Sequence, residues 1–203
     1  MLIDFRTLFP KYNINPTGVL HVGANVGEEA PIYDELGIKD VCWIEANIQL
    51  ISQLRITASK YNHRVIHACI GDIQDLEIEL HISNNAGQSS SILEFGTHKI
   101  AHPDVHYVGS NVMKMKRIDQ ISCFGEYDFL NIDLQGAELK ALKGMGDTLK
   151  HFKWAYLEVN KEELYKGCAL IDSIDLFMIA NHFRRVETKW CGNTGWGDAL
   201  YIK

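Results

Sequence analysis

A turn that combines two glycines with two acids is the first group of residues able to do chemistry. The segment "VLHVGANVGEE" starts as an apolar run, contains Gly23 and Gly27, and ends on Glu28 and Glu29. Turns that bind dinucleotides have the spacing G-x-G-x-x-G, which lets a pyrophosphate rest on the N-terminus of the following helix. Of that pattern only Gly23 is present, because the other two positions hold Asn25 and Glu28.

The acids of this turn indicate which cofactor it accepts. Two like charges about 4 Å apart repel by about 4 kcal/mol at a surface-like dielectric, so Glu28 and Glu29 disfavour NAD and FAD. A cofactor with a positive charge and no phosphate fits better, and S-adenosylmethionine (SAM) is the obvious candidate. Glu45 ends the next apolar run. An acid about 20 residues after the glycine turn can accept hydrogen bonds from both ribose hydroxyls.

The segment "NIDLQGAELKAL", residues 131–142, holds a second group of acids. Asp133 ends an apolar run, and a carboxylate buried there needs a partner such as a sulfonium, an amino group or a metal ion. Gly136 permits a tight turn into a helix. Glu138 falls in the first turn of that helix, where the helix dipole favours an acid. Helix-start chemistry therefore explains Glu138 as well as a role in binding does.

Short apolar runs alternate with helical patterns along the chain, which predicts the elements that position these residues. The expected strands are residues 18–24, 40–46, 64–70, 127–133, 153–159, 183–190 and 198–203, and the expected helices are 28–36, 48–60, 137–149 and 169–182. The last two strands form a hairpin around the glycine-rich "CGNTGWG". This order predicts an α/β fold, with a mostly parallel sheet, helices on both faces and an antiparallel edge. Ligands bind at the carboxyl ends of strands in such sheets, where the acids lie.

Residues 84–110 break the alternation, because Ser, Asn, Gly and His dominate and periodicity is weak. The flanking residues 76–83 and 111–118 could form an extra pair of strands. A long stretch of this kind inside a compact domain is usually a lid or a binding loop, and the alternative is a floppy surface insertion.

Bulk composition predicts one soluble, cytoplasmic domain over residues 1–203. The chain has 203 residues, is 46% hydrophobic, and has no linker-like segment. A net charge of −6 argues against nucleic acid or a membrane surface as a partner. Five widely spaced cysteines, one of them Cys123, predict neither disulfides nor a zinc ribbon, and no signal peptide or membrane span is apparent. The oligomeric state is not predicted.

The chain resembles the FkbM family of SAM-dependent methyltransferases. The segments "HVGANVGEE", "WIEAN", "NNAGQSSSI", "IDLQGAELKALKG", "YLEV" and "GWGDALYIK" follow that family's pattern in order, from about residue 18 to the C-terminus. The resemblance implies the class I methyltransferase fold, a Rossmann-like three-layer sandwich around a seven-stranded sheet whose last strand is antiparallel. It also implies methyl transfer to an oxygen, typically a hydroxyl of a sugar or a natural product.

The resemblance also assigns roles to residues. For the cofactor, it places the methionine part of SAM against the first turn, the ribose at the second strand and adenine at the third; the residues are His21, Gly23, Ala24, Asn25, Gly27, Glu45, Ala46, Cys69, Ile70, Asp72 and Asp133. Many family members have an acid in place of His21, so the contacts at the methionine end are expected to differ. From the chemistry of the residues themselves, the candidates for binding the acceptor are Asn85, Ser89, Ser90, Glu138 and Trp196. The alternative for Trp196 is packing at the edge of the core.

A sugar hydroxyl is a poor nucleophile until it loses its proton, so a general base is expected. The candidate bases are Asp133, Glu158 and His106, the last of these within the 84–110 loop. A Mg²⁺ ion held by Asp133, Glu158 and Asn160 is an alternative, because it would lower the pKa of the hydroxyl directly.

The favoured hypothesis is a SAM-dependent O-methyltransferase whose acceptor is a sugar, a glycan or a nucleotide sugar. The alternatives are a non-catalytic module that binds SAM or a nucleoside, and a methyltransferase that acts on a small molecule other than a sugar. Methylation of RNA ribose is a further hypothesis, but the chain lacks the basic surface that RNA binding requires.

Overall fold

A seven-stranded sheet forms the centre of the computed structural model, which describes residues 1–122 and 127–203; Cys123 lies outside these ranges. The strand order is β3-β2-β1-β7-β8-β10-β9. The strands are β1 (Val19–Val22), β2 (Val41–Glu45), β3 (Arg64–His67), β7 (Phe129–Ile132), β8 (Trp154–Asn160), β9 (Arg184–Trp190) and β10 (Trp196–Ile202).

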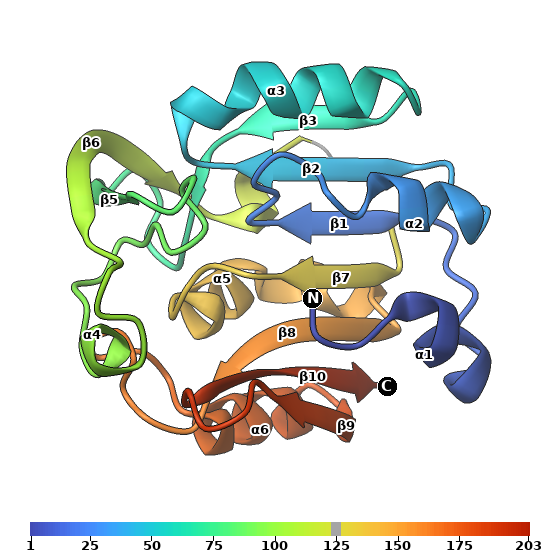
Figure 1. The fold of residues 1–203 in the computed structure, drawn as a ribbon. Helices are drawn as coiled ribbons and strands as arrows, with labels where there is room; N and C mark the ends of the chain where they lie inside the picture. Colours follow the sequence, from blue (N-terminus) through green and yellow to red (C-terminus); the bar gives the residue numbers. More distant parts are fainter. Residues whose placement is uncertain (123–126) are drawn as a thin grey trace.

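Strand directions match the predicted class. Strands β3, β2, β1, β7 and β8 are parallel to one another, whereas β10 runs antiparallel to both β8 and β9. The parallel strands all end at the edge of the sheet that lies on the left of Figure 1. Strand β1 has β2 on one side and β7 on the other, so strand order reverses beside it, where α/β sheets bind their ligands. The predicted fold class is confirmed.

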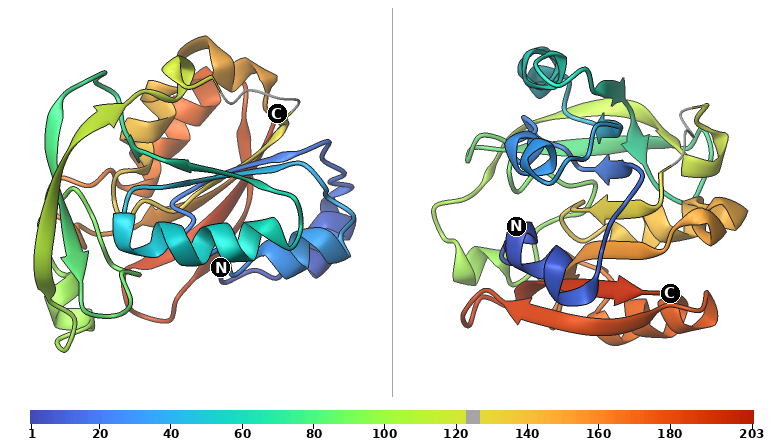
Figure 2. Two further views of the ribbon diagram at one scale, coloured as in Figure 1. Left: turned by 90° about the horizontal axis from the view of Figure 1, so that it is seen from above. Right: turned by 90° about the vertical axis from the view of Figure 1, so that its right-hand side faces the viewer.

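Helices cover both faces of the sheet (Figure 2). On one face lie α1 (Phe5–Tyr12), α2 (Ala30–Glu35) and α3 (Ile48–Ser59), and on the other lie α5 (Glu138–Gly144) and α6 (Ile171–Ala180). Alternate strand residues supply the two cores, because successive side chains of a strand point to opposite faces. Val19 packs with the first helix group and Leu20 with the second, and both are fully buried.

A second, three-stranded sheet stands at the carboxyl edge and consists of β4 (Cys69–Ile70), β5 (Glu77–Ser83) and β6 (Tyr107–Lys116). Strands β5 and β6 form an antiparallel ribbon, and β4 is parallel to β6. The loop between β5 and β6, residues 84–106, contains the short helix α4 (His98–Ala101) and is called the lid below. The extra pair of strands is therefore present, and β6 begins four residues inside the predicted loop.

The lid is tied to the loop that follows β8. The backbone N–H of Gly96 donates to the carbonyl of Leu164 at 2.7 Å. The ring of Phe95 stacks on Tyr107, with centroids 4.0 Å apart, and lies 5.6 Å from the ring of Tyr165. This small aromatic core explains how a segment without periodicity holds one conformation over the ends of the strands.

Two predicted elements are each divided in the structure. The strand expected over 64–70 divides, because residues up to His67 pair with β2 whereas Cys69 and Ile70 pair with β6. The helix expected over 137–149 ends at Gly144 and continues as the 3₁₀ helix Gly146–His151, because Gly146 has a φ of 50°.

Helix α1, which was not predicted, is held by its amphipathic pattern. It buries Phe5, Leu8 and Phe9 against the sheet. Its N-cap is Asp4, whose side chain accepts from the N–H of Arg6.

A second 3₁₀ helix spans Ile118–Gln120. None of the helices in the described part of the chain combines the length and the apolarity that crossing a membrane requires.

Candidate active site

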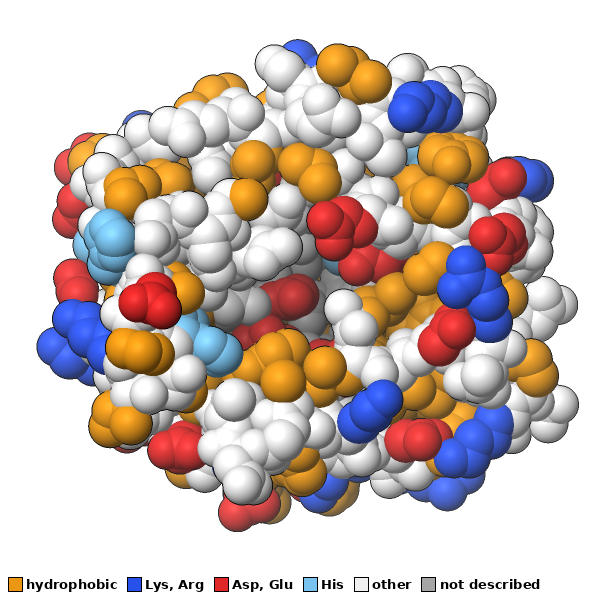
Figure 3. Space-filling model, in the orientation of Figure 1, with side chains coloured by type: hydrophobic (Ala, Val, Ile, Leu, Met, Phe, Trp, Pro, Cys, Tyr) orange, Lys and Arg blue, Asp and Glu red, His pale blue; other side chains and the backbone are white. Residues whose placement is uncertain are grey.

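The carboxyl ends of the central strands and the lid enclose a cavity of about 470 Å³. Figure 3 shows this hollow in the face of the molecule, with acidic side chains in and around it. The volume is in the range of sites that bury a ligand of cofactor size. Of the residues predicted to bind the cofactor, His21, Gly23, Ala24, Asn25, Glu45, Ala46, Cys69, Ile70 and Asp133 all line it.

The turn after β1 is shaped by close backbone packing. Gly23 has a φ of 86°, and a Cβ built there would overlap the carbonyl oxygen of Asp133. Its N–H donates to the carbonyl of Ile44 at 2.9 Å, which joins the turn to β2. Gly27 does not line the cavity: its φ is 76°, and it lies beneath α3 with Leu54 3.0 Å from the position of a Cβ. The role predicted for Gly27 in cofactor binding is therefore corrected to helix packing.

Glu45 is oriented by the backbone on both sides. Its Oε2 accepts from the N–H of Asn25 at 2.8 Å, and its Oε1 accepts from the N–H of Asn47 at 2.7 Å. The carboxylate lines the cavity next to the glycine turn. Each oxygen keeps a lone pair for a further donor, such as a ribose hydroxyl.

His21 is buried beside the methionine end of the predicted cofactor site. Its Nδ1 lies 3.1 Å from the hydroxyl of Tyr33, and its ring is 4.7 Å from the ring of Trp43. Burial lowers the pKa of His21 to about 3, so this imidazole is neutral at physiological pH.

At the predicted adenine end, Cys69 and Ile70 are buried and line the cavity, but Asp72 does not. The backbone carbonyl of Asp72 accepts from the guanidinium of Arg117 at 2.9 Å. The Oδ1 atom of Asp72 is buried and has no hydrogen-bond partner among the described residues, so the cofactor-binding role predicted for Asp72 stays a prediction.

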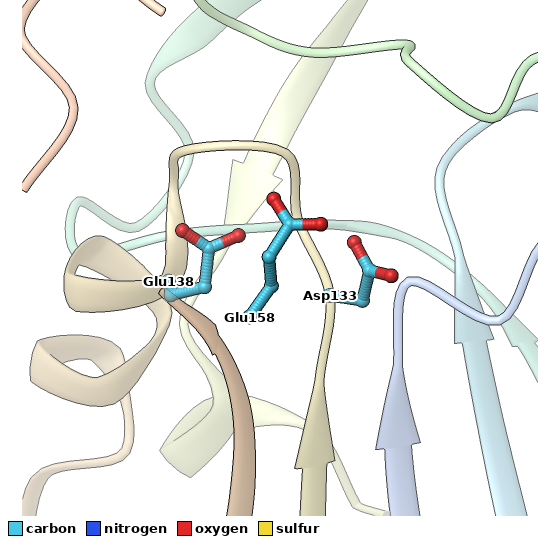
Figure 4. A group of neighbouring side chains, drawn as sticks. All are labelled: Asp133, Glu138 and Glu158. Atoms are coloured by element: carbon cyan, nitrogen blue, oxygen red, sulfur yellow. The ribbon is translucent and has the colours of Figure 1, made fainter. Parts of the chain in front are cut away.

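Gln135 bridges the two acids that were predicted as bases. Its side-chain nitrogen donates to Oδ1 of Asp133 at 2.6 Å and to Oε2 of Glu158 at 2.8 Å. The hydroxyl of Tyr165 donates in turn to Oε1 of Gln135 at 2.6 Å. Figure 4 shows the carboxyl groups of Asp133 and Glu158 next to each other, with Glu138 beyond them. The amide thus holds both acids in one orientation at the wall of the cavity.

The pKa values of both bridged acids are raised. Burial raises the pKa of Asp133 to about 6, although the hydrogen bond from Gln135 acts in the opposite direction. Burial, followed by the negative charges of Asp133 and Glu138, raises the pKa of Glu158 well above its usual value. Two adjacent carboxyl groups cannot both ionise easily at a buried site. Ionisation of one carboxyl group of the pair therefore opposes ionisation of the other.

Glu138 closes the turn between β7 and α5. Its Oε1 accepts from the N–H of Leu134 at 2.8 Å and from the N–H of Gly136 at 3.1 Å. The side chain is buried and does not line the cavity. The substrate-binding role predicted for Glu138 is therefore corrected: its carboxylate satisfies backbone donors at the start of a helix.

The side chains do not fit the predicted Mg²⁺ site. Asp133, Glu138 and Glu158 have oxygens within 4.8 Å of one another, but Glu138 is used by the backbone. An N–H donor, the Gln135 amide, occupies the position between Asp133 and Glu158 that a cation would need. Asn160 is fully buried, does not line the cavity, and has no hydrogen-bond partner for its side chain among the described residues. The predicted role of Asn160 in binding Mg²⁺ is not supported.

The lid presents hydroxyl and amide groups to the cavity. Asn85 donates to Oγ of Ser89 at 3.0 Å, and Oγ of Ser90 accepts from the backbone N–H of Ser83 at 3.1 Å. Asn85, Ser89, Ser90 and Trp196, all predicted to bind the acceptor, line the cavity. The hydrogen bonds of Asn85 and Ser90 hold the polar groups of the lid at the cavity.

His106 does not reach the cavity. Its side chain is exposed, with Nδ1 3.2 Å from the side chain of Asn84 and 3.2 Å from the carbonyl of Asp104. The prediction that His106 acts as a base is therefore corrected, because strand β6 begins directly after it and directs it outward. The imidazoles of the lid that do line the cavity are His98 and His102.

Comparison with known sequences decides the family. A sequence model of the family described as "Methyltransferase FkbM domain" matches residues 21–185. The chain belongs to the FkbM methyltransferase family. The 2-O-methyltransferase NoeI of Sinorhizobium fredii (strain NBRC 101917 / NGR234) is 25% identical over 182 residues, which cover 82% of this chain and 74% of that protein.

Solved structures share the fold of this FkbM methyltransferase. The magnesium protoporphyrin IX methyltransferase ChlM from Synechocystis PCC 6803, with bound SAM, superposes with a TM-score of 0.54 and 10% identity, covering 98% of this chain and 75% of that one. TrmK of M. capricolum, in complex with S-adenosyl-homocysteine, superposes with a TM-score of 0.55 and 8% identity, covering 100% and 70%. Similarity at this identity establishes the class I methyltransferase fold.

Sequence reasoning missed three residues of this FkbM methyltransferase site: Gln135, Tyr165 and His98. Gln135 was visible in "IDLQGAE", directly between a strand-end acid and a glycine, and its φ of 52° shows that the chain reverses there. Tyr165 had no signal, because it reaches Gln135 from a loop 30 residues further on. His98 is buried with Nε2 3.3 Å from Oγ of Ser89, and it occupies this position because Phe95 and Tyr165 pack around it.

Proposed function

We propose that this protein transfers a methyl group from SAM to a hydroxyl of a sugar or glycan. The observation that carries the proposal is the carboxyl group of Asp133 at the cavity wall, held by Gln135 and adjoining the turn at Gly23. One cavity thus contains a cofactor-binding turn, an acid able to accept a proton, and a lid lined with hydroxyl groups.

The residues present fit SAM. Glu45 offers both carboxylate oxygens to the ribose hydroxyls, and buried Cys69 and Ile70 offer an apolar wall to adenine. The acidic lining at Glu28 and Glu29 suits a molecule that carries a sulfonium and an amino group. SAM, when bound, supplies a methyl group on a positively charged sulfur. The relatives with bound SAM and S-adenosyl-homocysteine have the same fold.

Asp133 is the candidate base, because it adjoins the turn at Gly23, whereas burial and two neighbouring acids raise the pKa of Glu158 well above its usual value. In the proposed step, the carboxylate of Asp133 takes the proton of the acceptor hydroxyl while that oxygen forms a bond to the methyl carbon and the carbon–sulfur bond breaks. The role proposed for Glu158 is to position Gln135, through the hydrogen bond that its Oε2 accepts. Proximity and orientation within the closed cavity supply much of the acceleration.

The lid supports a sugar as the acceptor. Asn85, Ser89 and Ser90 present groups that hydrogen-bond to hydroxyls, and the ring of Trp196 offers a face for sugar C–H groups. The similarity to NoeI, which is a 2-O-methyltransferase, favours transfer to oxygen. The buried thiols of Cys69 and Cys168, which form no disulfide, support a reducing compartment, the cytoplasm, as the location.

The test is to incubate the protein with labelled SAM and a broad panel of sugars and glycans. We expect label in a sugar, loss of transfer by at least about 100-fold in Asp133→Asn, and retained SAM binding by calorimetry in that variant. We expect a metal chelator to leave turnover unchanged, because the side chains do not fit the Mg²⁺ site. SAM binding without transfer to any acceptor would instead favour the non-catalytic module.

A further inference from the structure

The charged side chains that line the cavity are all of one sign. Among residues 1–122 and 127–203, no lysine or arginine lines it, whereas six acids do: Glu28, Glu29, Glu45, Asp133, Glu158 and Asp198. This imbalance is much larger than the net charge of −6 on the whole chain would produce, because the protein has 20 lysine and arginine residues to place. Side-chain cations are therefore absent from the cavity. The positive group of the lining is the α-amino group of Met1, whose charge acts on Glu29, Asp133 and Asp198, on the acidic side and away from the lid.

Two imidazoles of the lining, those of His21 and His98, do not replace those cations at physiological pH. Burial lowers the pKa of His21 to about 3 and the pKa of His98 to about 4. Both rings are therefore neutral, and each is already placed by a neighbour: Tyr33 for His21 and Ser89 for His98. His102 is the third imidazole, and it lies 4.9 Å from the ring of His98.

The acids and the neutral polar groups occupy different parts of the cavity. Glu28, Glu29 and Glu45 come from the turns after β1 and β2, where the cofactor is proposed to bind. The lid contributes amides, hydroxyls and imidazoles and no acid to the lining. An acceptor beneath the lid would thus meet neutral donors and acceptors of hydrogen bonds, with the carboxyl groups of Asp133 and Glu158 on its other side.

We infer that the acceptor is an uncharged polyhydroxyl compound, a free glycan or glycoside, and that the site excludes phosphate-bearing sugars, nucleotide sugars among them. This inference rests on the proposed function and narrows its acceptor class. A diphosphate needs arginine, lysine or a row of backbone N–H donors to replace its water. Here it would lose its hydration among carboxylates, and like charges brought together in an interface oppose binding strongly. A neutral sugar needs only the hydrogen bonds that the lid offers.

The experiment compares matched acceptors that differ only in charge. For each of several sugars, methyl transfer from labelled SAM is measured to the methyl glycoside, the sugar 1-phosphate and the nucleoside-diphosphate sugar. We expect kcat/KM to be at least about tenfold higher for the neutral member of each set. We also expect added salt to reduce this preference, because salt screens the repulsion.

A variant that adds a cation tests the physical cause. Gln88 is exposed at the rim of the cavity, so a lysine can be placed there without burying its charge. We expect Gln88→Lys to raise the ratio of kcat/KM for the sugar phosphate over kcat/KM for the glycoside at least about tenfold, relative to Gln88→Met, which has similar length and no charge.

The outcomes separate the inference from the proposed function. Equal or faster transfer to the phosphorylated sugars in the unmodified protein would overturn the inference and leave sugar methylation in place. An identical charge preference in Gln88→Lys and Gln88→Met would also overturn it, since repulsion would not be the cause. Failure of transfer to every sugar of the panel would overturn the proposed function itself, and the inference with it.

Discussion

The α-carbon of Gly23 lies directly against the backbone carbonyl of Asp133. This contact joins the cofactor turn after β1 to the strand end that holds the candidate base. The two residues that sequence reasoning selected independently are thus neighbours, and the geometry of one depends on the other.

Substitution of Gly23 by alanine is expected to disrupt both the cofactor turn after β1 and the end of β7 at Asp133. The residue combines a φ of 86° with an overlap between the added Cβ and the Asp133 carbonyl. Gly37 is the matched control, because its φ is 77° and nothing lies within 4 Å of its Cβ position. We expect Gly37→Ala to cost about 1–2 kcal/mol of unfolding free energy, the penalty of the left-handed conformation alone. Gly23→Ala should cost clearly more and weaken SAM binding, as measured by denaturant unfolding and calorimetry; equal costs would contradict the contact.

Replacement of Gln135 by methionine should impair turnover more than SAM binding. The variant keeps the length of the side chain and removes both hydrogen bonds to the acids. Because the bond from Gln135 lowers the pKa of Asp133, its loss should raise that pKa. We expect kcat to fall about 10- to 100-fold and the acidic limb of the pH–rate profile to move to higher pH. An unshifted limb would show that Gln135 has only a packing role.

The pH dependence of activity should report the ionisation of Asp133. With a pKa of about 6, the carboxyl group is protonated at pH 5 and ionised at pH 7.5. Since the base must be ionised, kcat/KM should rise through pH 6 and level off above pH 7. A rate that is constant between pH 5 and 7.5 would contradict the assignment of Asp133 as the base.

Replacement of Asp133 by asparagine should stabilise the folded protein at neutral pH. The folded-state pKa of Asp133 is raised above its ordinary value of 3.8, so the protonated form is the one that the fold favours. That contribution is fully present below pH 3.8 and is lost as pH rises through about 6. Asparagine remains neutral throughout, so the variant should melt about 3–6 °C higher than the unmodified protein at pH 7.5, with a smaller difference at pH 5. Calorimetric melting at the two pH values measures this, and an equal difference at both would contradict it.

Glu45→Gln should weaken SAM binding. The amide cannot accept from both Asn25 and Asn47 as the carboxylate does, and it carries no charge. We expect a rise in the Kd for SAM of about 10- to 100-fold, corresponding to the loss of about 1.5–3 kcal/mol of charged hydrogen bonding. Glu77→Gln, on the exposed start of β5, is the control and should leave the Kd unchanged. Equal affinity in both variants would remove Glu45 from the cofactor site.

The sequence by itself determined the class of the fold and where in it the site lies. Strands such as 127–133 have apolar residues on both faces and end in an acid, so local periodicity was enough to place Asp133 and Glu45 at the carboxyl edge. The glycine turn at Gly23 could also be predicted, because its conformation depends on the residues of the turn and of the strand before it.

Only the tertiary structure decided which of these groups meet and in what state. Tyr165 and the lid reach Gln135 across long loops, β4 leaves the main sheet to pair with β6, and His106 is directed away from the cavity. The raised pKa values of Asp133 and Glu158 also arise there, because burial is their main cause. The physical reason is that pairing between distant segments and the burial of charge are properties of the packed chain, whereas periodicity and turn chemistry are properties of a few neighbouring residues.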